Sequence, residues 1–305
     1  MLLLSSKEGT IGTYVEKGWE RLVPAIGKSG FERSAIVRRG IILIAVFVTA
    51  MALVSGCAPK QSSGGGSTIT LAGSTSVQPF AEILAEDYMT THPEVSVNVQ
   101  GGGSSAGVTA AQSGAAEIGM LSRELKGSEK GLKEYVIAHD AIAVAVHSSN
   151  PITQLSKVEI QGIFAGKITN WQEVGGPNHL IHVVSREEGS GTRSAFDELI
   201  MGKKEVTAWA MVQDSNGAVR ETVAGDRYCV GYISLGLVDN RVKALVIDGV
   251  TPSIQTVANK SYGIVRPFLF VTTTEPQGLS KEFIDYVLSP TGQNILKHEG
   301  LVPVR

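Results

Sequence analysis

The stretch Arg186-Glu187-Glu188-Gly189-Ser190-Gly191-Thr192-Arg193 comes just after the largely apolar segment 181–184, with one serine between them. A strand that ends in Gly-Ser-Gly-Thr and continues into the helical pattern of residues 194–200 predicts a strand, a tight turn and a helix. The first backbone N–H groups of a helix have no intrahelical acceptor and carry the positive end of its dipole. Two hydroxyls and an arginine accompany them here, which predicts a site for a tetrahedral anion. An ordinary serine-capped helix after a glycine turn would use the same residues, so the stretch alone leaves both interpretations open.

Three more turns with hydroxyl side chains follow strand-like segments earlier in the chain. The segments and the turns after them are 68–71 with 72–76, 95–99 with 101–107, and 118–121 with 122–123. Ligands of open α/β sheets bind beyond the carboxyl ends of the strands. We therefore expect the four turns to face one crevice.

Other glycine-rich site types fit these turns poorly. The run 101–107 lacks the G-x-G-x-x-G spacing of a dinucleotide site, and no lysine followed by Ser or Thr completes a Walker A loop. A hydrolase nucleophile elbow needs glycines two residues before and after the serine, where this chain has Glu188 and Thr192.

Five motifs carry a family resemblance. In chain order they are Gly73-Ser74-Thr75-Ser76-Val77, residues 100–107, residues 163–171, residues 186–192 and Arg266-Pro267-Phe268. In this order the chain resembles the phosphate-binding proteins of phosphate ABC transporters, a periplasmic substrate-binding protein family, from residue 68 to residue 305. The resemblance implies an α/β, two-lobed periplasmic-binding-protein fold of type II. Each lobe would be a mainly parallel sheet flanked by helices, with the ligand in the cleft between them.

The resemblance also implies the phosphate contacts. They are Thr75 and Ser76 in the first turn, Ser104 in the second, Ser122 in the third, and Arg186, Ser190, Gly191 and Thr192 in the fourth. Many relatives place an aspartate in the third turn, where it accepts the proton of monohydrogen phosphate and excludes sulfate, but this chain has Ser122. A hydroxyl donates as well as accepts, so phosphate still fits while sulfate meets no buried carboxylate. Our hypothesis is that phosphate is preferred, with Glu187 or Glu188 restoring the discrimination.

The function implied is capture of inorganic phosphate and its delivery to the permease and ATPase subunits of an ABC importer. The alternatives are a receptor for another tetraoxyanion (sulfate, molybdate or tungstate) and an exported phosphoesterase. The esterase needs a base-activated nucleophile or metal ligands, and the motifs show neither. We therefore expect a monomer that is not an enzyme, without cofactor or metal and without nucleic acid as a partner.

The beginning of the chain predicts export. Two arginines at 38 and 39 precede an apolar stretch, 40–54, that ends in Ser55-Gly56-Cys57. This is the pattern of a secretory signal, and its likeness to a lipobox implies that Cys57 carries lipid. An uncleaved membrane anchor is the alternative, although the stretch is shorter than the ~20 residues of a spanning helix. Either way the protein would be extracytoplasmic and tethered to the outer face of the cell membrane, periplasmic or at the cell surface.

The expected organisation has five parts. They are an extension and lipoprotein signal (1–57), a flexible Gly/Ser linker (58–67), the first part of lobe 1 (68–147), lobe 2 (148–245), and a hinge return with the second part of lobe 1 (246–305). Residues 1–37 precede the signal pattern and would be either an upstream start or a cytoplasmic extension.

Charge and composition add few constraints. The chain has 27 Lys and Arg against 29 Asp and Glu, a net charge of −2, so anion capture has to depend on local donors. With Cys57 lipidated, Cys229 would be a small buried hydrophobic residue. We expect Phe164 and Trp171 to belong to the core of lobe 2 rather than to contact the ligand. Arg123 could reach the anion or pair with a carboxylate at the rim of the cleft, and we expect the pairing.

Overall fold

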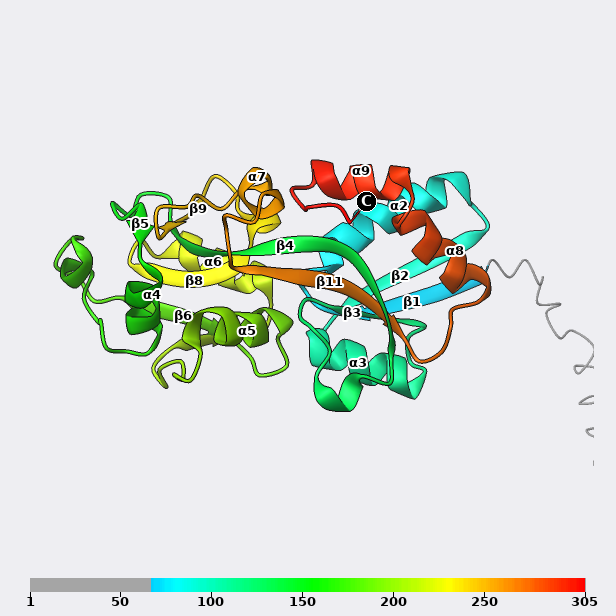
Figure 1. The fold of residues 1–305 in the computed structure, drawn as a ribbon, viewed down its shortest axis with the longest axis horizontal. Coiled ribbons are helices and arrows are strands. Elements are labelled where there is room, and N and C mark those ends of the chain that lie inside the picture. Colours follow the sequence, from blue (N-terminus) through cyan, green and yellow to red (C-terminus); the bar gives the residue numbers. More distant parts are fainter. Residues whose placement is uncertain (1–66, 305) are drawn as a thin grey trace, which may run out of the picture. The chain divides into compact units, whose positions relative to one another are not determined.

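The computed structural model describes residues 67–304, which form one nine-stranded sheet with helices on its faces (Figure 1). Its strands are β1 (Ser67–Gly73), β2 (Val95–Gly101), β3 (Ile118–Leu121), β4 (Lys133–His147), β6 (His182–Arg186), β7 (Met211–Gln213), β8 (Cys229–Ser234), β9 (Val242–Ala244) and β11 (Val265–Thr272). They are ordered β2-β1-β3-β11-β4-β8-β6-β7, and β9 pairs with β4 off this path. A separate two-stranded sheet joins β5 (Gln154–Leu155) to β10 (Val246–Ile247).

Lobe 1 is built on the parallel strands β1, β2 and β3. Its helices are α2 (Gln78–Thr91), α3 (Ser104–Ser113), α8 (Gly278–Val287) and α9 (Pro290–His298). Successive strand residues point to opposite faces of a sheet, and β11 follows this rule. Phe268 and Phe270 pack with α2, α8 and α9, whereas Leu269 and Val271 pack with α3. Lobe 1 is therefore a sheet covered by helices on both faces.

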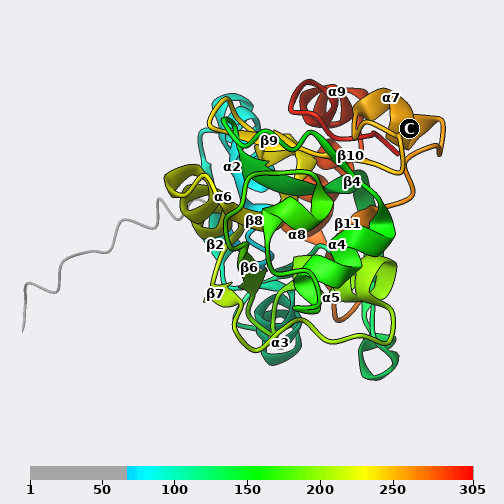
Figure 2. The same ribbon diagram turned by 90° about the vertical axis from the view of Figure 1, so that its left-hand side faces the viewer.

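Lobe 2 repeats this arrangement on the parallel strands β6, β7 and β8 (Figure 2). Its helices are α4 (Lys157–Phe164), α5 (Gly191–Phe196) and α6 (Asn216–Gly225). Phe164, Phe196 and Tyr232 pack together in the larger core, where the Phe196 and Tyr232 rings are stacked with their centroids 4.0 Å apart. Trp171 is fully buried in the same core, so the prediction that Phe164 and Trp171 are core residues is confirmed.

Two long strands connect the lobes. β4 has 15 residues, about 50 Å at ~3.3 Å per residue, which is long enough to serve both lobes. Its first part pairs antiparallel with β11, and its last part pairs antiparallel with β8 and β9. The predicted two-lobed α/β fold with mainly parallel strands in each lobe is confirmed. The antiparallel pair β4–β11 makes the two lobe sheets continuous.

The remaining elements are short. They are η1 (Gly127–Glu129), η2 (Trp171–Val174), η4 (Leu235–Leu237), the π-helical segment η3 (Asp197–Met201), and α7 (Ile254–Ala258). None of the helices within residues 67–304 combines the length and the apolarity that crossing a bilayer would need. The apolar stretch 40–54 and Cys57 lie outside the described residues.

Candidate functional site

The first turn joins β1 to α2. Gly73 has a φ of +139°, and a Cβ there would lie 2.3 Å from the carbonyl oxygen of Met120. Only glycine fits this close approach of two strands. The turn then folds back on itself, since the Ser74 hydroxyl accepts a hydrogen bond from the Ser76 amide at 3.2 Å. Both serines are buried.

The second and third turns meet the first one inside lobe 1. Ser104 begins α3, and its hydroxyl accepts a hydrogen bond from the Ser122 amide at 3.0 Å. Ser74 donates its own hydroxyl proton to the Ser122 hydroxyl at 2.9 Å. β1 lies between β2 and β3 and is parallel to both, so the carboxyl ends of the three strands lie at one edge of the sheet. The serines that follow these three strands therefore form one hydrogen-bonded group.

The fourth turn comes from lobe 2 and touches this group. Ser190 caps α5 by accepting from the Arg193 amide at 3.1 Å. A Cβ at Gly191 would lie 2.1 Å from the Ser104 hydroxyl oxygen and 2.6 Å from that of Ser122. The lobe 2 turn can therefore approach the lobe 1 serines this closely only with glycine at 191.

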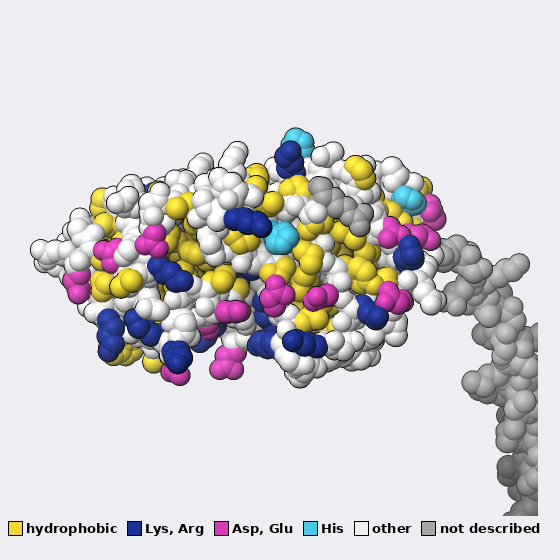
Figure 3. Space-filling model, viewed as in Figure 1, with side chains coloured by type: hydrophobic (Ala, Val, Ile, Leu, Met, Phe, Trp, Pro, Cys, Tyr) yellow, Lys and Arg dark blue, Asp and Glu magenta, His cyan; other side chains and the backbone are white. Residues whose placement is uncertain are grey.

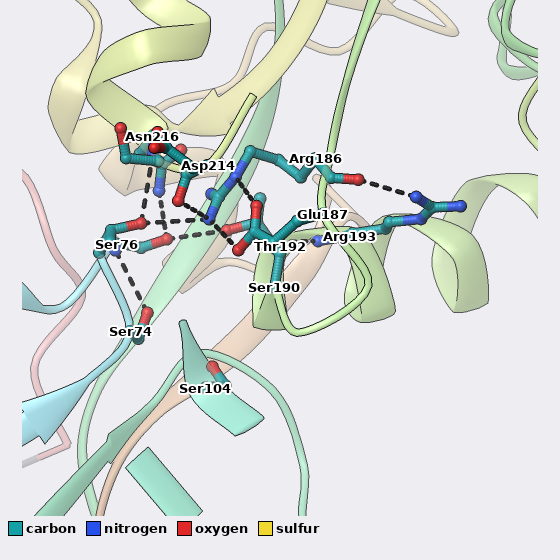
Figure 4. A network of polar contacts seen from close by, with 12 residues as sticks. Ser74, Ser76, Ser104, Arg186, Glu187, Ser190, Thr192, Arg193, Asp214 and Asn216 are labelled. Carbon is teal, nitrogen blue, oxygen red and sulfur yellow. Dashed lines mark hydrogen bonds and ion pairs between the residues drawn. The ribbon is translucent and has the colours of Figure 1, made fainter. Parts of the chain in front are cut away.

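Direct hydrogen bonds join the two lobes around these turns (Figure 4). The Ser76 and Thr192 hydroxyl oxygens are 2.8 Å apart. Thr75 accepts from Arg186 Nη2 at 3.2 Å and from the Asn216 amide at 3.3 Å. The side chains of Ser76 and Asn216 are hydrogen-bonded as well. The polar cluster is thus enclosed between the lobes, and most of its members are fully buried.

Arg186 is the main cationic group on the lobe 2 side of the cluster. Its side chain is 1% exposed, and Nε and Nη2 each donate to a different oxygen of Glu187 at 2.8 Å. Among the described residues, its buried Nη1 has no hydrogen-bond partner. A buried N–H group without an acceptor is unfavourable. This arginine is therefore held in place by Glu187 with one of its nitrogens still able to bind an anion.

A second buried arginine comes from the strands that connect the lobes. Arg266 on β11 donates through Nε and Nη2 to Asp140 on β4 at 3.0 and 2.9 Å. Arg266 also donates to the Ser76 hydroxyl at 3.2 Å, and Asp140 accepts from Ser234 at 2.8 Å. Burial raises the pKa of the Asp140 carboxyl and lowers that of the Arg266 guanidinium, while the ion pair between them opposes both shifts.

All eight residues predicted for the site lie in this one cluster. They are Thr75, Ser76, Ser104, Ser122, Arg186, Ser190, Gly191 and Thr192. Their contact with phosphate stays a prediction. The structure adds Ser74, Asp140, Asn216 and Arg266. Asn216 had a recognisable signal, because it opens a helix after a strand just as the four recognised turns do.

Arg123 lies beside Ser122 but takes a different partner. Its Nη1 and Nη2 donate to the two oxygens of Glu129 at 2.6 and 2.9 Å. The hydrogen bond from Arg123 lowers the pKa of the Glu129 carboxyl. The expected pairing with a carboxylate is therefore present, and it stabilises the connection between β3 and β4.

The visible surface offers no extended basic field. On the face shown in Figure 3, Lys and Arg side chains are interspersed with Asp and Glu. Dissolved ions screen exposed charges beyond about 8 Å at physiological salt. An anion would therefore be bound mainly by the local donors between the lobes.

A family model described as a PBP superfamily domain matches residues 58–291. The phosphate-binding protein PstS of Bacillus subtilis is 35% identical over 251 residues, which are 80% of this chain and 82% of that protein. The protein of the same name from Borreliella burgdorferi is 27% identical over 278 residues, 87% of this chain and 99% of that one. The fold and the enclosed polar cluster agree with this class of two-lobed solute-binding proteins.

Solved structures give the same result. A phosphate ABC transporter substrate-binding protein from Clostridium perfringens with bound phosphate is 46% identical, with a TM-score of 0.76, covering 78% of this chain and 100% of that one. An ABC-type phosphate transport receptor from Vibrio cholerae is 38% identical, with a TM-score of 0.65, covering 77% and 99%. The chain belongs to the PstS family of phosphate-binding proteins within the PBP superfamily. These relatives are described as binding or receptor proteins, in agreement with the prediction that the chain is not an enzyme.

Proposed function

We propose that this chain captures inorganic phosphate outside the cytoplasm and delivers it to the permease and ATPase subunits of an ABC importer. Two lines of support agree. The relatives are named for phosphate binding or phosphate transport. The structure independently places a set of hydroxyl and amide donors, with a buried arginine, between two lobes.

Arg186 carries this proposal. It is buried, oriented by Glu187, and has an Nη1 group for which residues 67–304 provide no acceptor. An oxyanion placed between Arg186 and the serines would satisfy that donor. Hydrogen bonds to charged groups contribute roughly 1.5–3 kcal/mol each, and micromolar affinity needs about 8 kcal/mol. A few of the contacts available here are enough.

We propose the eight clustered residues as the phosphate contacts: Thr75, Ser76, Ser104, Ser122, Arg186, Ser190, Gly191 and Thr192. The hydrogen-bond directions favour an anion. The Ser76 hydroxyl accepts from Asn216 and Arg266, so its proton points to Thr192 and can turn to a ligand between the lobes. The Ser122 hydroxyl accepts from Ser74 and so also has a proton to donate. The lobe 1 side of the site thus presents mainly donors to a ligand.

The choice between phosphate and sulfate depends on an acceptor for the phosphate proton. Of the two glutamates considered for this role, Glu187 lies in the cluster, where both of its oxygens bind Arg186. A carboxylate oxygen has two lone pairs, so Glu187 can hold the arginine and still accept a proton from the ligand. We propose that phosphate is preferred over sulfate for this reason.

Competitive calorimetric titration tests the proposal directly. The purified protein is titrated with phosphate, arsenate, sulfate and molybdate in the same buffer. We expect phosphate to bind most tightly, with arsenate close to it because it has the same shape and carries the same kind of proton. Sulfate or molybdate binding as tightly as phosphate would overturn the phosphate assignment in favour of a general tetraoxyanion receptor. Turnover of a generic phosphate ester, abolished by Ser190→Ala, would instead support an esterase.

We further propose that the protein is a monomer tethered outside the cell through lipid on Cys57, with residues 58–67 as the linker. We also propose that lobe 1 comprises residues 68–147 and 246–305, and that lobe 2 comprises residues 148–245. The basic, apolar and small-residue pattern before Cys57 supports the tether. Mass spectrometry of the mature N-terminus in wild type and Cys57→Ser tests it. An uncleaved N-terminus in the wild type would favour a membrane anchor. The molar mass measured by light scattering tests whether the protein is a monomer.

A further inference from the structure

Three side chains with different donor atoms lie together at the edge of lobe 2 that is far from the anion cluster. His182 is the first residue of β6, Cys229 is the first residue of β8, and Asp226 lies in the turn just before β8. The His182 ring nitrogen, a carboxylate oxygen of Asp226 and the Cys229 sulfur all lie within 4.8 Å of one another. Within the described residues, no other His, Cys, Asp or Glu group meets this criterion.

The backbone fixes this arrangement. His182 and Cys229 are directly paired residues of the parallel strands β6 and β8. The His182 amide donates to the Tyr228 carbonyl at 3.1 Å, and the Cys229 amide donates to the Asp226 carbonyl at 3.0 Å. The strand register and a tight turn therefore determine that these three residues are neighbours, and the His182 and Asp226 side chains adjust within this frame.

We propose that His182, Asp226 and Cys229 form a binding site for a borderline-soft divalent cation of the zinc class. Imidazole nitrogen, thiolate sulfur and carboxylate oxygen are the three ligand types that such ions take from proteins. Three protein ligands leave the fourth tetrahedral position for water.

The distances need only a small adjustment. Ligands at the usual zinc bond lengths of ~2.0–2.3 Å lie roughly 3.3–3.6 Å apart around a tetrahedral ion. His182 Nδ1 and Asp226 Oδ2 are now 2.5 Å apart, and their side chains are 45% and 33% exposed. Both side chains are thus exposed enough to separate by about 1 Å. Asp226 Oδ1 accepts from the Tyr228 amide at 2.8 Å, which holds the carboxylate and leaves Oδ2 for the ion.

A path to the site exists from outside. His182 and Asp226 line a surface cavity of about 580 Å³, whose other lining residues include Leu180, Trp209 and Met211. Cys229 is buried behind them. An ion would therefore enter from the cavity, meet the histidine and the carboxylate first, and take the sulfur as its innermost ligand.

This site is separate from the anion cluster. His182 precedes Arg186 by four residues on β6, and Cys229 precedes Ser234 by five on β8. At ~3.3 Å per residue the two sites are about 13–17 Å apart, at opposite ends of the same two strands. The proposal does not depend on phosphate binding, and variants at these three positions leave the predicted phosphate contacts in place.

Cobalt(II) provides a spectroscopic test, because a cobalt–thiolate bond gives a near-ultraviolet charge-transfer band. The purified full chain is titrated with Co²⁺ and then with Zn²⁺ as a competitor. We expect one Co²⁺ per chain with a thiolate band that Zn²⁺ displaces. Cys229→Ser should remove the band, and His182→Gln should weaken binding by about 100-fold or more, beyond the ~10–100-fold cost of outer-shell changes.

Two controls make the result specific. His298→Gln removes an exposed histidine at the end of α9 and should leave Co²⁺ affinity unchanged. Circular dichroism and denaturant unfolding of each variant check that it is folded, and His182→Gln is the safer variant because its side chain is partly exposed. Absence of a thiolate band in the wild type, a band that survives Cys229→Ser through Cys57, or equal affinity in His182→Gln would each overturn the proposal. The three residues would then be only a hydrogen-bonded structural group.

Discussion

At the scale of single residues, the site depends on how each polar atom is already engaged. Arg186 shows this most clearly. Glu187 binds its Nε and Nη2 and so orients the planar guanidinium, while Nη1 stays without an acceptor among residues 67–304. The rigid guanidinium can therefore bind Glu187 with two nitrogens and direct the third at an anion, whereas an ammonium group acts as a point charge.

Arg186→Lys tests the importance of this geometry. The charge is kept, but an ammonium group cannot be held by both Glu187 oxygens while a third nitrogen faces the anion, so we expect phosphate affinity to fall by about 10- to 100-fold, the equivalent of one charged hydrogen bond. Calorimetry gives the affinity. Arg241→Lys is the matched control, because Arg241 makes surface ion pairs with Glu221 and Asp239 and should bind phosphate as the wild type does. Equal losses in the two variants would contradict a specific role for Arg186.

Gly191→Ala tests the close approach of the lobes. The new Cβ would lie 2.1 Å from the Ser104 hydroxyl oxygen, so the fourth turn could no longer approach the lobe 1 serines. We expect phosphate binding to be strongly weakened while each lobe stays folded. Gly217→Ala, in α6 with no atom within 4 Å of the new Cβ, is the control and should leave binding unchanged. It should also stabilise the helix by up to about 1 kcal/mol. Undiminished binding by Gly191→Ala in calorimetry would argue against closure through this contact.

At the scale of elements, loop connections are stabilised by buried ion pairs as well as by packing. The β3–β4 connection contains the pair Arg123–Glu129, whose side chains are 4% and 11% exposed. The Glu129 carboxylate also accepts from the Lys126 amide at 2.9 Å, at the start of η1. The Glu129 carboxylate therefore both pairs with Arg123 and accepts a hydrogen bond from the backbone at the start of η1.

Glu129→Gln should change the pH dependence of the free energy of unfolding, because it removes the charge of the Arg123–Glu129 ion pair. The pKa of Glu129 is lowered in the folded state, mainly by the hydrogen bond from Arg123, so its contribution is fully present above its unfolded pKa of about 4.5. That contribution is lost as pH falls through the lower folded pKa. We expect Glu129→Gln to be destabilised by roughly 1–3 kcal/mol at pH 7. The difference from the wild type should shrink below about pH 4.5.

Denaturant unfolding at pH 7, 5, 4 and 3 measures this difference. The control is Glu124→Gln, an exposed glutamate in the same connection, which should change stability by no more than about 0.5 kcal/mol. A difference between wild type and Glu129→Gln that stays constant at all four pH values would show that charge on Glu129 does not stabilise the fold.

At the scale of the whole molecule, ligand binding and folding are linked because the cluster takes residues from both lobes. Thr75 and Ser76 of lobe 1 contact Arg186 and Thr192 of lobe 2 across the site. A ligand between the lobes binds the folded protein only, and it stabilises that state by mass action.

Phosphate should therefore raise the free energy of unfolding by about 2.7 kcal/mol when its concentration is 100 times its dissociation constant. Sulfate at the same concentration should raise it much less, and phosphate should give Arg186→Lys a smaller increase than it gives the wild type. Chemical denaturation with and without each anion provides the measurement. The same increase with sulfate would mean that the effect is a general salt effect or that the site does not discriminate.

From the sequence by itself, local patterns predicted alternating strands and helices and the four strand-end turns with hydroxyl side chains, and the family resemblance implied the two-lobed arrangement and the eight site residues. Strand periodicity, glycine turns and hydroxyl caps are each contained in a few consecutive residues. The sequence also allowed Phe164 and Trp171 to be assigned to the core, although Trp209 of the same lobe is 82% exposed, so residue type alone does not decide burial.

Only the tertiary structure decided which distant residues meet. The register of β4 with β11 pairs Asp140 with Arg266, and the register of β6 with β8 pairs His182 with Cys229. The positions of those residues along the chain do not predict either contact. Strand pairing is non-local, and a shift of one residue would send every side chain to the other face of the sheet, so register is set by the packed core as a whole.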